Sequence, residues 1–559
     1  MPFVDSAELA GTGTGEGAAL VGFVAAGAGA VARTALVKMR DVINVRDFGA
    51  LGNGQNLDGS INASADDSAA IRAADAACGE RATLYFPVGV YVVKQDGTNP
   101  WCIRKKSSNR WVGDAMGGSI IHPHSTVPVT CDIVLEVPSA SYLSRGGGCS
   151  DINIANAANG SRTGRHAWHV NTTDALSTPD LQINGNIYER LSTGSPTSDS
   201  QGYGFCHTNS ASNTEGGMYD SHVRESVLGG GFKFTKTGDS NTLRDIRTSG
   251  FLPNVLDQIV NAEGSANTFT IDGWNCTNGG GLLQVTNAPG LIIRGINGED
   301  FAGGAATYNG SAAVWLKAPP AWANATAYAI GDLVSQSNII YRSRVAHTSA
   351  TATDQPGTGS SWGTKWADYD PFENVSFGPG LVSVSTGFDG NALFRIDSGN
   401  RISVNKVRAL TGIPGITPFI VYAAVTNADL RWNTYTPGLA VSARLSNSGT
   451  ETIFDSYDTA TQATSKSTGV TLNTATGTIT MNNASLAANT AVGFQLINNL
   501  IGANDTVAVM IKGGATADAY QVSVDMVSAG SCRISLRNVT GGALAEAVAL
   551  NFRGEKAGI

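Results

Sequence analysis

The chain has 559 residues, too many for one compact core, so several modules are expected. With 68 glycines and only 15% charged residues, the composition favours a fold rich in tight turns over a helical one. The net charge of −8 and a pI near 5.4 argue against a nucleic-acid partner, because no basic surface is available to neutralise phosphates.

The N-terminal part divides into a flexible segment and a neck. Residues 1–31 are small and Gly-rich, a composition that does not fold alone. Residues 31–42 (VARTALVKMRDV) predict a short amphipathic helix, so residues 1–41 form a first module. The Ala/Gly-rich stretch 17–32 has no basic leader and is too short and Gly-rich to span a membrane. We therefore expect no membrane insertion, synthesis in the cytoplasm and no processing.

The next block predicts a helix that covers an exposed end of the following module. Asp66 or Asp67 is a good N-cap for a helix over residues 68–77, and Gly79 is a good C-cap. Such a helix would cover the first rung of a stacked-strand fold, which otherwise leaves an apolar face and strand edges open.

One short pattern recurs through residues 149–298 and again through 372–409: an apolar residue, two polar or Gly residues, an apolar residue, any residue, then an apolar or small one. Its units are Cys149-Ile152-Ile154, Tyr188-Leu191-Thr193, Val223-Ser226-Leu228, Leu243-Ile246-Thr248, Ile271-Trp274-Cys276, Ile293-Ile296-Gly298, Phe372-Val375-Phe377 and Val404-Val407-Ala409. The spacing of roughly 20 to 35 residues is typical of a stacked repeat, and short alternating strands cannot bury a face alone. We predict an all-β parallel β-helix over residues 42–317 and 371–410.

Residues 47–91 resemble the opening of a known family. Asp47-Phe48-Gly49-Ala50, Gly52-Asn53-Gly54, the predicted helix, and Phe86-Pro87-Val88-Gly89-Val90-Tyr91 look like the start of pectate-lyase-like right-handed β-helices, and more narrowly of bacteriophage tailspikes. The common GDG of the family is GNG here, and Asn tolerates the same turn. The resemblance implies a virion component in the phage tail, made in the host cytoplasm, that docks to a phage tail or adaptor protein through residues 1–41.

Residues 318–370 interrupt the repeat with an aromatic-rich insert. It resembles small chitin-binding-type carbohydrate modules at positions that include Trp322, Tyr328, Tyr341 and Trp362. Sugar rings stack their C–H faces on exposed aromatic rings, so these four residues are candidate substrate-binding residues. The alternative is that the aromatics form the core of a mini-domain of about 50 residues, which otherwise has little to bury.

Residues 411–559 lose the pattern and predict a C-terminal antiparallel β-sandwich, since alternating strands are joined by Gly, Asn and Ala turns. Residues 531–553 resemble the terminal domains of phage tail fibres and spikes. That resemblance implies a homotrimer whose last domain holds three chains together and contacts the receptor.

The sequence contains no Walker loop, no HExxH and no GxSxG motif. His122 and His124 are better interpreted as a loop pair than as metal ligands. The seven cysteines, odd in number and irregularly spaced, form neither a disulfide framework nor a CxxC metal pair. We expect no metal and no cofactor, and we expect Cys149 and Cys276 to be small apolar fillers at inward positions.

Carboxylates remain as the candidate chemistry. The two residues between the first apolar positions of each unit fall in a turn, so stacking places them in one column: Ser150-Asp151, Glu189-Arg190, Arg224-Glu225, Arg244-Asp245, Asp272-Gly273, Arg294-Gly295, Glu373-Asn374 and Asn405-Lys406. Rungs stack about 4.8 Å apart, so carboxylates on neighbouring rungs approach the separation found in retaining glycosidases.

We predict that Glu225, Asp245 and Asp272 supply the catalytic acid and base. Arg224 and Arg244 could hold acidic sugar groups bidentately, and Asp272, close to Trp274 as a substrate-binding residue, is the better general acid. Alternating Arg and Asp/Glu also make a salt-bridged, solvated face, which is the competing interpretation. Other acids could serve, namely Asp220, Asp239, Asp257, Glu263, Glu299 and Asp300, and in a trimer the site could lie between chains.

Two classes of function follow. The first is a spike that binds a bacterial surface polysaccharide and depolymerises it, by hydrolysis or by β-elimination. The second is a binding-only adhesin on a virion, with the insert as its glycan contact. A bacterial polysaccharide lyase or epimerase is a third possibility.

Overall fold

The computed structural model of the chain describes residues 5–56, 58, 60–138, 143–155, 161–173, 182–196, 202–209, 217–250, 254–258, 268–277, 283–301, 312–384, 392–411, 417–430, 434–435, 444–446, 452–454 and 457–555. The chain divides into two compact units. Unit 1 contains Met1–Ser265 and Phe269–Thr277, and unit 2 contains Ala266–Thr268 and Asn278–Ile559. Among the described helices, none is both long enough and apolar enough to cross a membrane.

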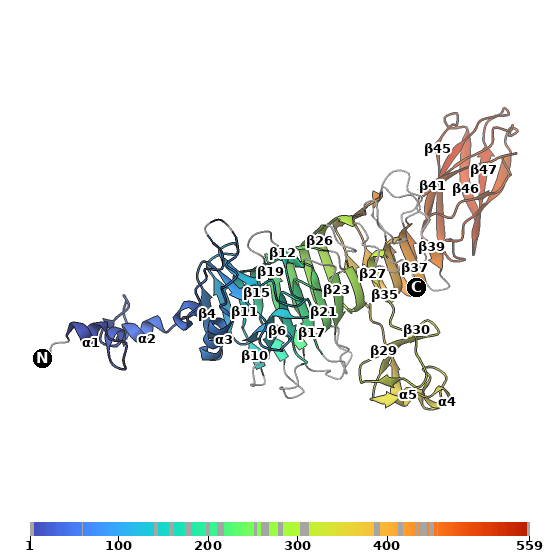
Figure 1. Ribbon diagram of the computed structural model, residues 1–559. Helices are drawn as coiled ribbons and strands as arrows, with labels where there is room; N and C mark the ends of the chain where they lie inside the picture. The colour runs from blue at the N-terminus through green and yellow to red at the C-terminus, as the bar shows by residue number, and fades with distance from the viewer. Residues whose placement is uncertain are drawn as a thin grey trace. The chain divides into compact units, whose positions relative to one another are not determined.

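Unit 1 is built from parallel strands that stack in columns, as in a right-handed parallel β-helix (Figure 1). The first column pairs β3 (Ile43–Asn44), β4 (Thr83–Phe86), β5 (Gly89–Val93), β7 (Arg110–Gly113), β8 (Ser119–Pro123), β11 (Gly148–Ile154), β15 (Ile187–Thr193), β19 (His222–Arg224), β20 (Val227–Gly229), β22 (Asn241–Ser249) and β24 (Phe269–Thr277). The second pairs β6 (Trp101–Lys106), β9 (Asp132–Val137), β13 (Trp168–Asn171), β17 (Phe205–Thr208), β21 (Phe232–Thr237) and β23 (Asn254–Gln258). A third, shorter column contains β10 (Leu143–Arg145), β14 (Gln182–Asn184) and β18 (Gly217–Tyr219).

The register predicted for the central rungs is confirmed. Cys149 pairs with Tyr188, and Leu243 pairs with Ile271, each in parallel strands. The inward positions are buried, including Cys149 at 0% and Cys276 at 2% exposure, and all seven cysteines are unpaired and buried. Equal spacing of apolar residues across rungs therefore determined the stacking, since a one-residue slip would turn each apolar side chain outward.

The predicted capping helix is present as α3 (Ser68–Ala77) and lies beside the first rungs (Figure 1). Asp66, not Asp67, accepts the hydrogen bond from the first-turn amide of Ser68, at 3.1 Å. Asp67 instead accepts from the backbone amides of Leu51 (2.6 Å) and Val92 (3.1 Å), so it ties the helix to the solenoid. The helix ends with Cys78 as its C-cap, one residue before the predicted Gly79.

The predicted neck helix over residues 31–42 is shorter in the structure. The helix α2 covers only Ala35–Met39, because Thr34 adopts an extended backbone and its hydroxyl accepts from the Val37 amide at 3.2 Å, which caps the helix there. A second short helix, α1 (Ser6–Ala10), begins with a capping box between Asp5 and Glu8.

The interior of unit 1 contains a buried ion pair among stacked aromatic rings. Lys105 and Glu136 are cross-strand partners in β6 and β9, both at 0% exposure, with Nζ and Oε1 3.5 Å apart. The Lys105 ammonium also donates to the backbone carbonyls of Lys106 (2.9 Å) and Asn109 (2.7 Å), and Trp168 donates to Glu136 at 2.7 Å. Burial raises the pKa of Glu136, while the positive charge of Lys105 opposes that rise. The pair is thus held by complete hydrogen bonding, which a buried charge requires.

Replacing Lys105 by Met should destabilise the protein by about 3–5 kcal/mol, because Glu136 and two backbone carbonyls would lose a buried partner. The measurement is thermal or urea unfolding followed by circular dichroism. Lys106→Met on the same strand is the matched control and should lose much less, because this partly buried side chain donates only to the carbonyls of Ala76 (3.2 Å) and Cys78 (3.4 Å) and leaves no buried charge behind. The double variant Lys105→Met/Glu136→Gln should recover part of the loss. Equal stability of Lys105→Met and the wild type would contradict a stabilising role for the pair.

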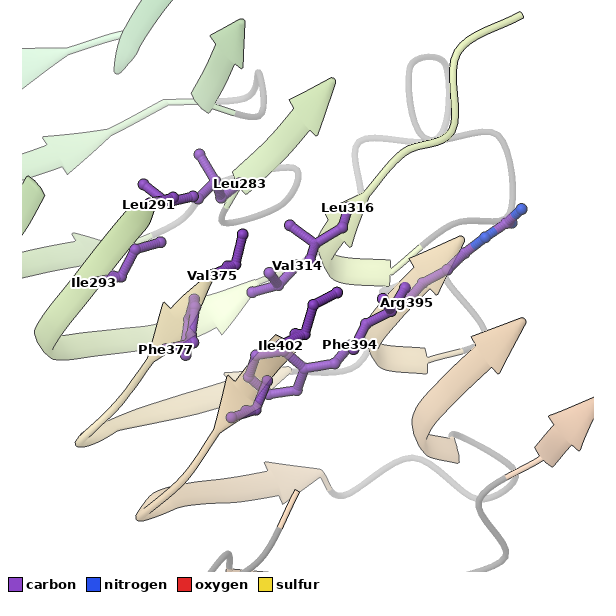
Figure 2. A pocket seen from close by; sticks show the side chains of 12 residues that line it. Leu283, Leu291, Ile293, Val314, Leu316, Val375, Phe377, Phe394, Arg395 and Ile402 are labelled. Atoms are coloured by element: carbon purple, nitrogen blue, oxygen red, sulfur yellow. The ribbon is translucent and has the colours of Figure 1, made fainter. Parts of the chain in front are cut away.

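Unit 2 begins with a second run of parallel strands. One column pairs β25 (Leu283–Asn287), β27 (Ala312–Leu316), β35 (Ala392–Val404), β37 (Thr417–Leu430) and β39 (Arg444–Ser446). The other pairs β26 (Leu291–Phe301), β33 (Ser376–Phe377), β34 (Gly380–Val384) and β36 (Val407–Thr411), and β38 (Thr434–Tyr435) and β40 (Thr452–Phe454) extend the pairing. Figure 2 shows that the side chains around its interior are apolar and that the Arg395 guanidinium is directed away. They enclose a void of about 10 Å³. A void of this size is too small for a sugar.

The predicted register is wrong at one place in unit 2. Ile293 pairs with Phe377, not with Phe372, and Phe377 pairs with Val404. Phe372 and Val375 are buried at 0% and 3%, but they lie in the turn before β33. The prediction failed because buried residues outside a strand show the same apolar spacing as inward residues of a strand.

The insert forms a small sub-structure within unit 2. Its strands are β28 (Ala327–Tyr328), β29 (Leu333–Gln336), β30 (Ile339–Ser343), β31 (His347–Thr348) and β32 (Trp366–Asp368), with one-turn helices α4 (Thr351–Asp354) and α5 (Trp362–Lys365). Their ladders are antiparallel and join strands of the insert, and an isolated parallel bridge joins Ala321 to Ser335, also within the insert. The insert therefore carries its own backbone hydrogen bonds and does not extend the parallel columns.

Deleting residues 319–368 and closing the gap with a short Gly/Ser linker should leave the parallel strands folded. Tyr369 is kept because its hydroxyl donates to Asn287 at 3.1 Å in the neighbouring rung. We expect a β-type circular dichroism spectrum with the same intensity per remaining strand residue as in the wild type. Thermal unfolding should stay cooperative. An unfolded deletion protein would show instead that the insert is part of the solenoid core.

The C-terminal domain is a β-sandwich that starts later than predicted. Parallel pairing continues through β37 to β40, so these strands extend the columns and the sandwich does not begin at 411. The sandwich has two four-stranded sheets, ordered β41 (Tyr457–Thr461), β43 (Thr476–Thr480), β48 (Ala549–Glu555), β45 (Thr506–Gly513), and β42 (Val470–Thr471), β44 (Ala491–Ile497), β47 (Ser531–Asn538), β46 (Tyr520–Ser528). Its core is apolar, with Ile534, Leu536 and Leu550 fully buried.

Candidate functional site

The predicted column of turn residues is a bend in the first column of unit 1, where each rung turns on one residue with a left-handed backbone. This residue is Asp151 (φ 59°), Arg190 (47°), Glu225 (50°), Asp245 (50°) and Gly273 (69°) on five rungs in order. Apart from Gly, few residues adopt this conformation freely, so the bend is maintained by the stacked pairing on either side of it. We call this line of residues the corner column.

The residue before each bend forms a second line, the pre-corner column. Strand pairing places Ser150, Glu189, Arg224, Arg244 and Asp272 in it. Glu225 and Asp245 therefore lie on adjacent rungs of the corner column, but Asp272 lies beside Arg244 in the pre-corner column. The three predicted catalytic acids are thus close together but do not form a single line.

On the first rungs the two columns form a closed ion-pair network. Arg190 donates bidentately to Asp151, at 2.6 and 2.8 Å, and also contacts Glu189. Arg224 donates to Glu189 at 3.0 Å. Burial of Glu189, only 13% exposed, disfavours its charge, but the hydrogen bonds from Arg224 and Arg190 outweigh burial and lower the pKa of Glu189. The salt-bridged interpretation describes this part of the face.

On the later rungs the same columns are open to solvent. The Glu225 and Asp245 side chains are 54% and 60% exposed, and that of Arg244 is 70% exposed. Their ion pairs are long: Arg190 to Glu225 at 3.6 Å, and Arg244 to Asp245 at 3.4 Å. Contacts this exposed contribute little to stability, so these side chains can contact a ligand instead.

Trp274 is a correction to the predicted site. It is 1% exposed, its ring centroid lies 5.2 Å from that of Phe232, and its indole nitrogen donates to the Thr248 hydroxyl at 2.9 Å. The side chain points into the solenoid because it occupies an inward position of the repeat, so it cannot stack on a sugar. It also does not provide Asp272 with an apolar environment.

The aromatic residues of the insert form a core. Tyr341 (4% exposed) and Trp366 (1%) are buried with Val334, and Trp322, Tyr328 and Trp362 are partly buried against them. The prediction that Tyr341 stacks on a sugar is wrong, because its ring is inside this core. The three partly buried rings keep some accessible surface, and glycan binding through them stays a prediction.

A second carboxylate pair lies at another corner of unit 1, just before the strands of the first column. Asp220 follows β18, Asp239 precedes β22, and the Asp220 amide donates to the Asp239 carbonyl at 3.3 Å. Burial raises the pKa of Asp239, and the negative charge of Asp220 raises it further. Asp220 is exposed. Two acids with environments this different can act as proton donor and as carboxylate.

Neighbouring side chains hold this pair in place. Asn241, 2% exposed, donates to the carbonyls of Met218 (2.7 Å) and Gly238 (2.9 Å) and accepts from the Ser221 amide (3.1 Å), so it connects both turns. The Tyr219 ring covers Gly238, where a Cβ would lie 2.4 Å from the ring. An aromatic ring therefore lies next to the two carboxylates, an arrangement that suits a sugar ligand.

The other acids named from the sequence are less suited. Asp257 faces Lys236 at 3.8 Å. Glu263 and the side chains of Glu299 and Asp300 lie outside the described residues. The sequence analysis did not rank Asp220 and Asp239 above these acids, because their corner lies outside the recurring pattern.

Within the described part of the chain, no group of three or more His, Cys, Asp or Glu side chains is arranged to hold a metal ion. His122 is 3% exposed in β8, and the ring of His124 contacts the Thr126 hydroxyl at 2.7 Å. The two histidines therefore have different surroundings, one buried in β8 and one partly buried directly after it.

No protein-family model and no curated protein matches this sequence. Among solved structures, the chain is similar to a tailspike protein double mutant of E. coli bacteriophage HK620, with 10% identity, a TM-score of 0.46, and coverage of 97% of this chain and 98% of that one. It is also similar to that phage's tailspike in complex with a pentasaccharide (12%, 0.38, 97% and 98%). A third is the A-module of the Azotobacter vinelandii mannuronan C-5 epimerase AlgE4 (12%, 0.37, 74% and 98%). Likeness at these levels concerns the fold and assigns no activity to this chain.

Replacing Glu189 by Gln should lower the free energy of unfolding by about 1–2 kcal/mol at neutral pH, through loss of charge-assisted hydrogen bonds. Because the folded-state pKa of Glu189 is lowered, its contribution is present at neutral pH and is lost as the pH falls through that pKa. The stability difference from wild type should therefore shrink on acidification. Asp272→Asn, the same kind of change on an exposed side chain of the same column, is the control. A difference independent of pH would contradict this assignment.

Proposed function

We propose that this protein is a phage tailspike that attaches the virion to its host by binding a bacterial surface polysaccharide and hydrolysing it. The observation that carries the hydrolytic part is the Asp220–Asp239 pair, in which burial and a neighbouring negative charge favour a protonated Asp239 beside an exposed Asp220. The sequence resemblance of residues 47–91 to tailspike openings supports the attachment role.

The stacked fold suits a long, repetitive ligand. Parallel pairing repeats the same surface position on each rung at about 4.8 Å, so a polysaccharide can contact several rungs in one orientation. The exposed Arg244, Asp245 and Asp272 continue the open part of the corner and pre-corner columns. Arg244 could bind acidic groups of the glycan there, and so could the partly exposed Arg224 next to it if it exchanges its contact with Glu189 for the ligand.

The reaction would follow the two-carboxylate mechanism. Asp239 donates its proton to the glycosidic oxygen, and a carboxylate oxygen of the exposed Asp220 attacks the anomeric carbon on the opposite side. The two turns lie one rung apart, a spacing of about 4.8 Å. This spacing is closer to the separation of about 5–5.5 Å between the two carboxyl groups of retaining glycosidases than to the larger separation in inverting enzymes. The rate should fall as the pH rises through the raised pKa of Asp239, since the donor loses its proton.

Asp239→Asn and Asp220→Asn should each lower depolymerisation by about 100-fold or more while polysaccharide binding is kept. The assay follows new reducing ends from host polysaccharide, with ultraviolet absorbance of unsaturated sugars recorded to detect β-elimination. Glu225→Gln and Asp245→Asn, amide changes of the same kind on the exposed corner column, are matched controls and should stay near wild-type rate.

The opposite pattern of activities would assign the active site to other residues. If Glu225→Gln, Asp245→Asn or Asp272→Asn abolished cleavage and the Asp220 and Asp239 variants were active, the corner column would hold the catalytic groups. If all five variants cleaved like wild type, the site would lie elsewhere, for example between subunits.

A binding-only adhesin is the second candidate. It is favoured by the ion-paired state of Asp151, Glu189 and Arg190, a structural use of the same kind of column. Wild-type protein that binds host polysaccharide with unchanged chain length and no new reducing ends would establish it. In that case the partly buried aromatics of the insert are the second place to look for the glycan contact.

Residues 1–41 are proposed to dock the spike to a phage tail or adaptor protein, and the chain is proposed to act as a homotrimer. Exposed apolar side chains concentrate in this segment, among them Leu9, Val24, Val31 and Met39 at 56–78% exposure. A protein that starts at Val42 should be soluble and keep its oligomeric state by light scattering, but should not join tail particles. Insoluble or dissociated protein would contradict a docking role confined to this segment.

A further inference from the structure

A second constellation of reactive groups lies on the second column of unit 1, away from the carboxylates described above. Its three members, Asp132, His169 and Thr208, come from β9, β13 and β17 on successive rungs. Asp132 Oδ2 and His169 Nδ1 are 2.6 Å apart, and His169 Nε2 and Thr208 Oγ1 are 2.7 Å apart. A hydroxyl, an imidazole and a carboxylate in this order are the parts of a nucleophile activated by a general base.

The carboxylate is fixed and ionised. Asp132 is 2% exposed and accepts two hydrogen bonds from Arg165, at 2.8 and 2.7 Å, and one from the His166 amide at 3.3 Å. Burial opposes its charge, but the bonds from Arg165 and His169 outweigh burial and hold the pKa of Asp132 below its ordinary value. An ionised Asp132 only accepts, so His169 Nδ1 carries a proton, and in the neutral ring Nε2 is left to accept from the Thr208 hydroxyl.

The three groups differ in solvent exposure in the way that their proposed roles require. Asp132 and His169 are covered, at 2% and 5% exposure, whereas Thr208 is only partly buried. The orienting groups are therefore shielded from water, and the hydroxyl that would react is the one that a ligand can reach.

Asn171 supplies a hydrogen-bond donor beside the hydroxyl. It is the cross-strand partner of Thr208 on the preceding rung. Its Oδ1 accepts from the Thr173 amide (2.8 Å) and hydroxyl (2.6 Å), so its N–H groups remain for another acceptor. An amide donor next to a nucleophile can stabilise the oxyanion of a tetrahedral intermediate.

We propose that Thr208, His169 and Asp132 form a triad that hydrolyses carboxylic esters with small acyl groups. Thr208 Oγ1 attacks the carbonyl carbon, its proton moves to His169 Nε2, and the carbonyl electron pair moves to the oxygen near Asn171. The intermediate collapses, the ester C–O bond breaks, and the leaving alcohol takes the proton from Nε2. Water then attacks the acyl–Thr208 ester, gives one proton to Nε2 and releases the acid, and Thr208 regains the proton. Thr208 and His169 are catalytic residues, and Asp132 is a positioning residue.

The acyl group is small because the neighbouring outward positions are polar. Thr235 is the partner of Thr208 on the following rung, and Lys233 is the partner of Cys206 beside it. These polar neighbours favour a short acyl group over a long apolar one. The activity does not depend on the proposed glycosidase, since it uses other residues on another column.

The experiment uses the full chain with two probes, p-nitrophenyl acetate turnover and a fluorophosphonate that bonds to activated hydroxyls, followed by peptide mass mapping. Wild type should turn over the ester and carry the adduct on Thr208. Thr208→Val should lose about 100-fold or more of both signals, and Thr208→Ser should keep them. Thr270→Val, the same change on a partly buried threonine of β24 in the first column, is the matched control and should behave as wild type.

The positioning role of Asp132 has its own readout. Asp132 orients the His169 ring through the 2.6 Å contact to Nδ1, so Asp132→Asn should slow labelling of Thr208. Asp132→Glu, which keeps a carboxylate at this position, should restore part of the labelling rate, a rescue that a merely structural role would not produce. The proposal is overturned if wild type shows no adduct on Thr208, or if folded Thr208→Val keeps wild-type turnover. If Thr208→Val does not fold, absence of an adduct on Ser at position 208 in the Thr208→Ser variant overturns it as well.

Discussion

In-register parallel stacking is the constraint on which the rest of unit 1 depends. Each backbone hydrogen bond between rungs fixes a side chain about 4.8 Å from its counterpart on the next rung. Identical or complementary residues then meet in columns, whether apolar, aromatic or charged. The residues with positive φ at the bend, such as Glu225 and Asp245, are tolerated because pairing on both sides holds the backbone there.

Stacking also explains why polar groups survive inside unit 1. Lys105 and Glu136 are buried as cross-strand partners, and Asp132, His169 and Thr208 are brought together from three rungs. A buried charge is costly unless each of its hydrogen-bonding atoms has a partner, and a column supplies partners from above and below. The same geometry that forms the core thus also assembles reactive groups.

The sequence predicted the rungs well where inward positions repeat without interruption, from Cys149 to Cys276. It also predicted the bounds of the capping helix, residues 68–77, but not its C-cap. It failed at Phe372, because a buried turn residue has the same apolar signal as a strand residue. It also assigned Trp274 to ligand binding although the same pattern places that residue inward. Composition could not predict which aromatic residues of the insert are buried and which are exposed. A module of that size needs aromatic residues for its core, and a glycan contact would need them on its surface.

The candidate sites were harder to predict than the fold for a physical reason. Asp132 and His169 are 37 residues apart and His169 and Thr208 are 39 apart, and their contact depends on loop lengths that no local pattern encodes. Asp220 and Asp239 meet only because the third column and the second column lead into the same corner. In a stacked fold, strand periodicity determines which residues are inward, whereas loop lengths determine which outward residues become neighbours. A search for reactive groups in such a chain should therefore compare residues by their column and rung rather than by their spacing in the sequence.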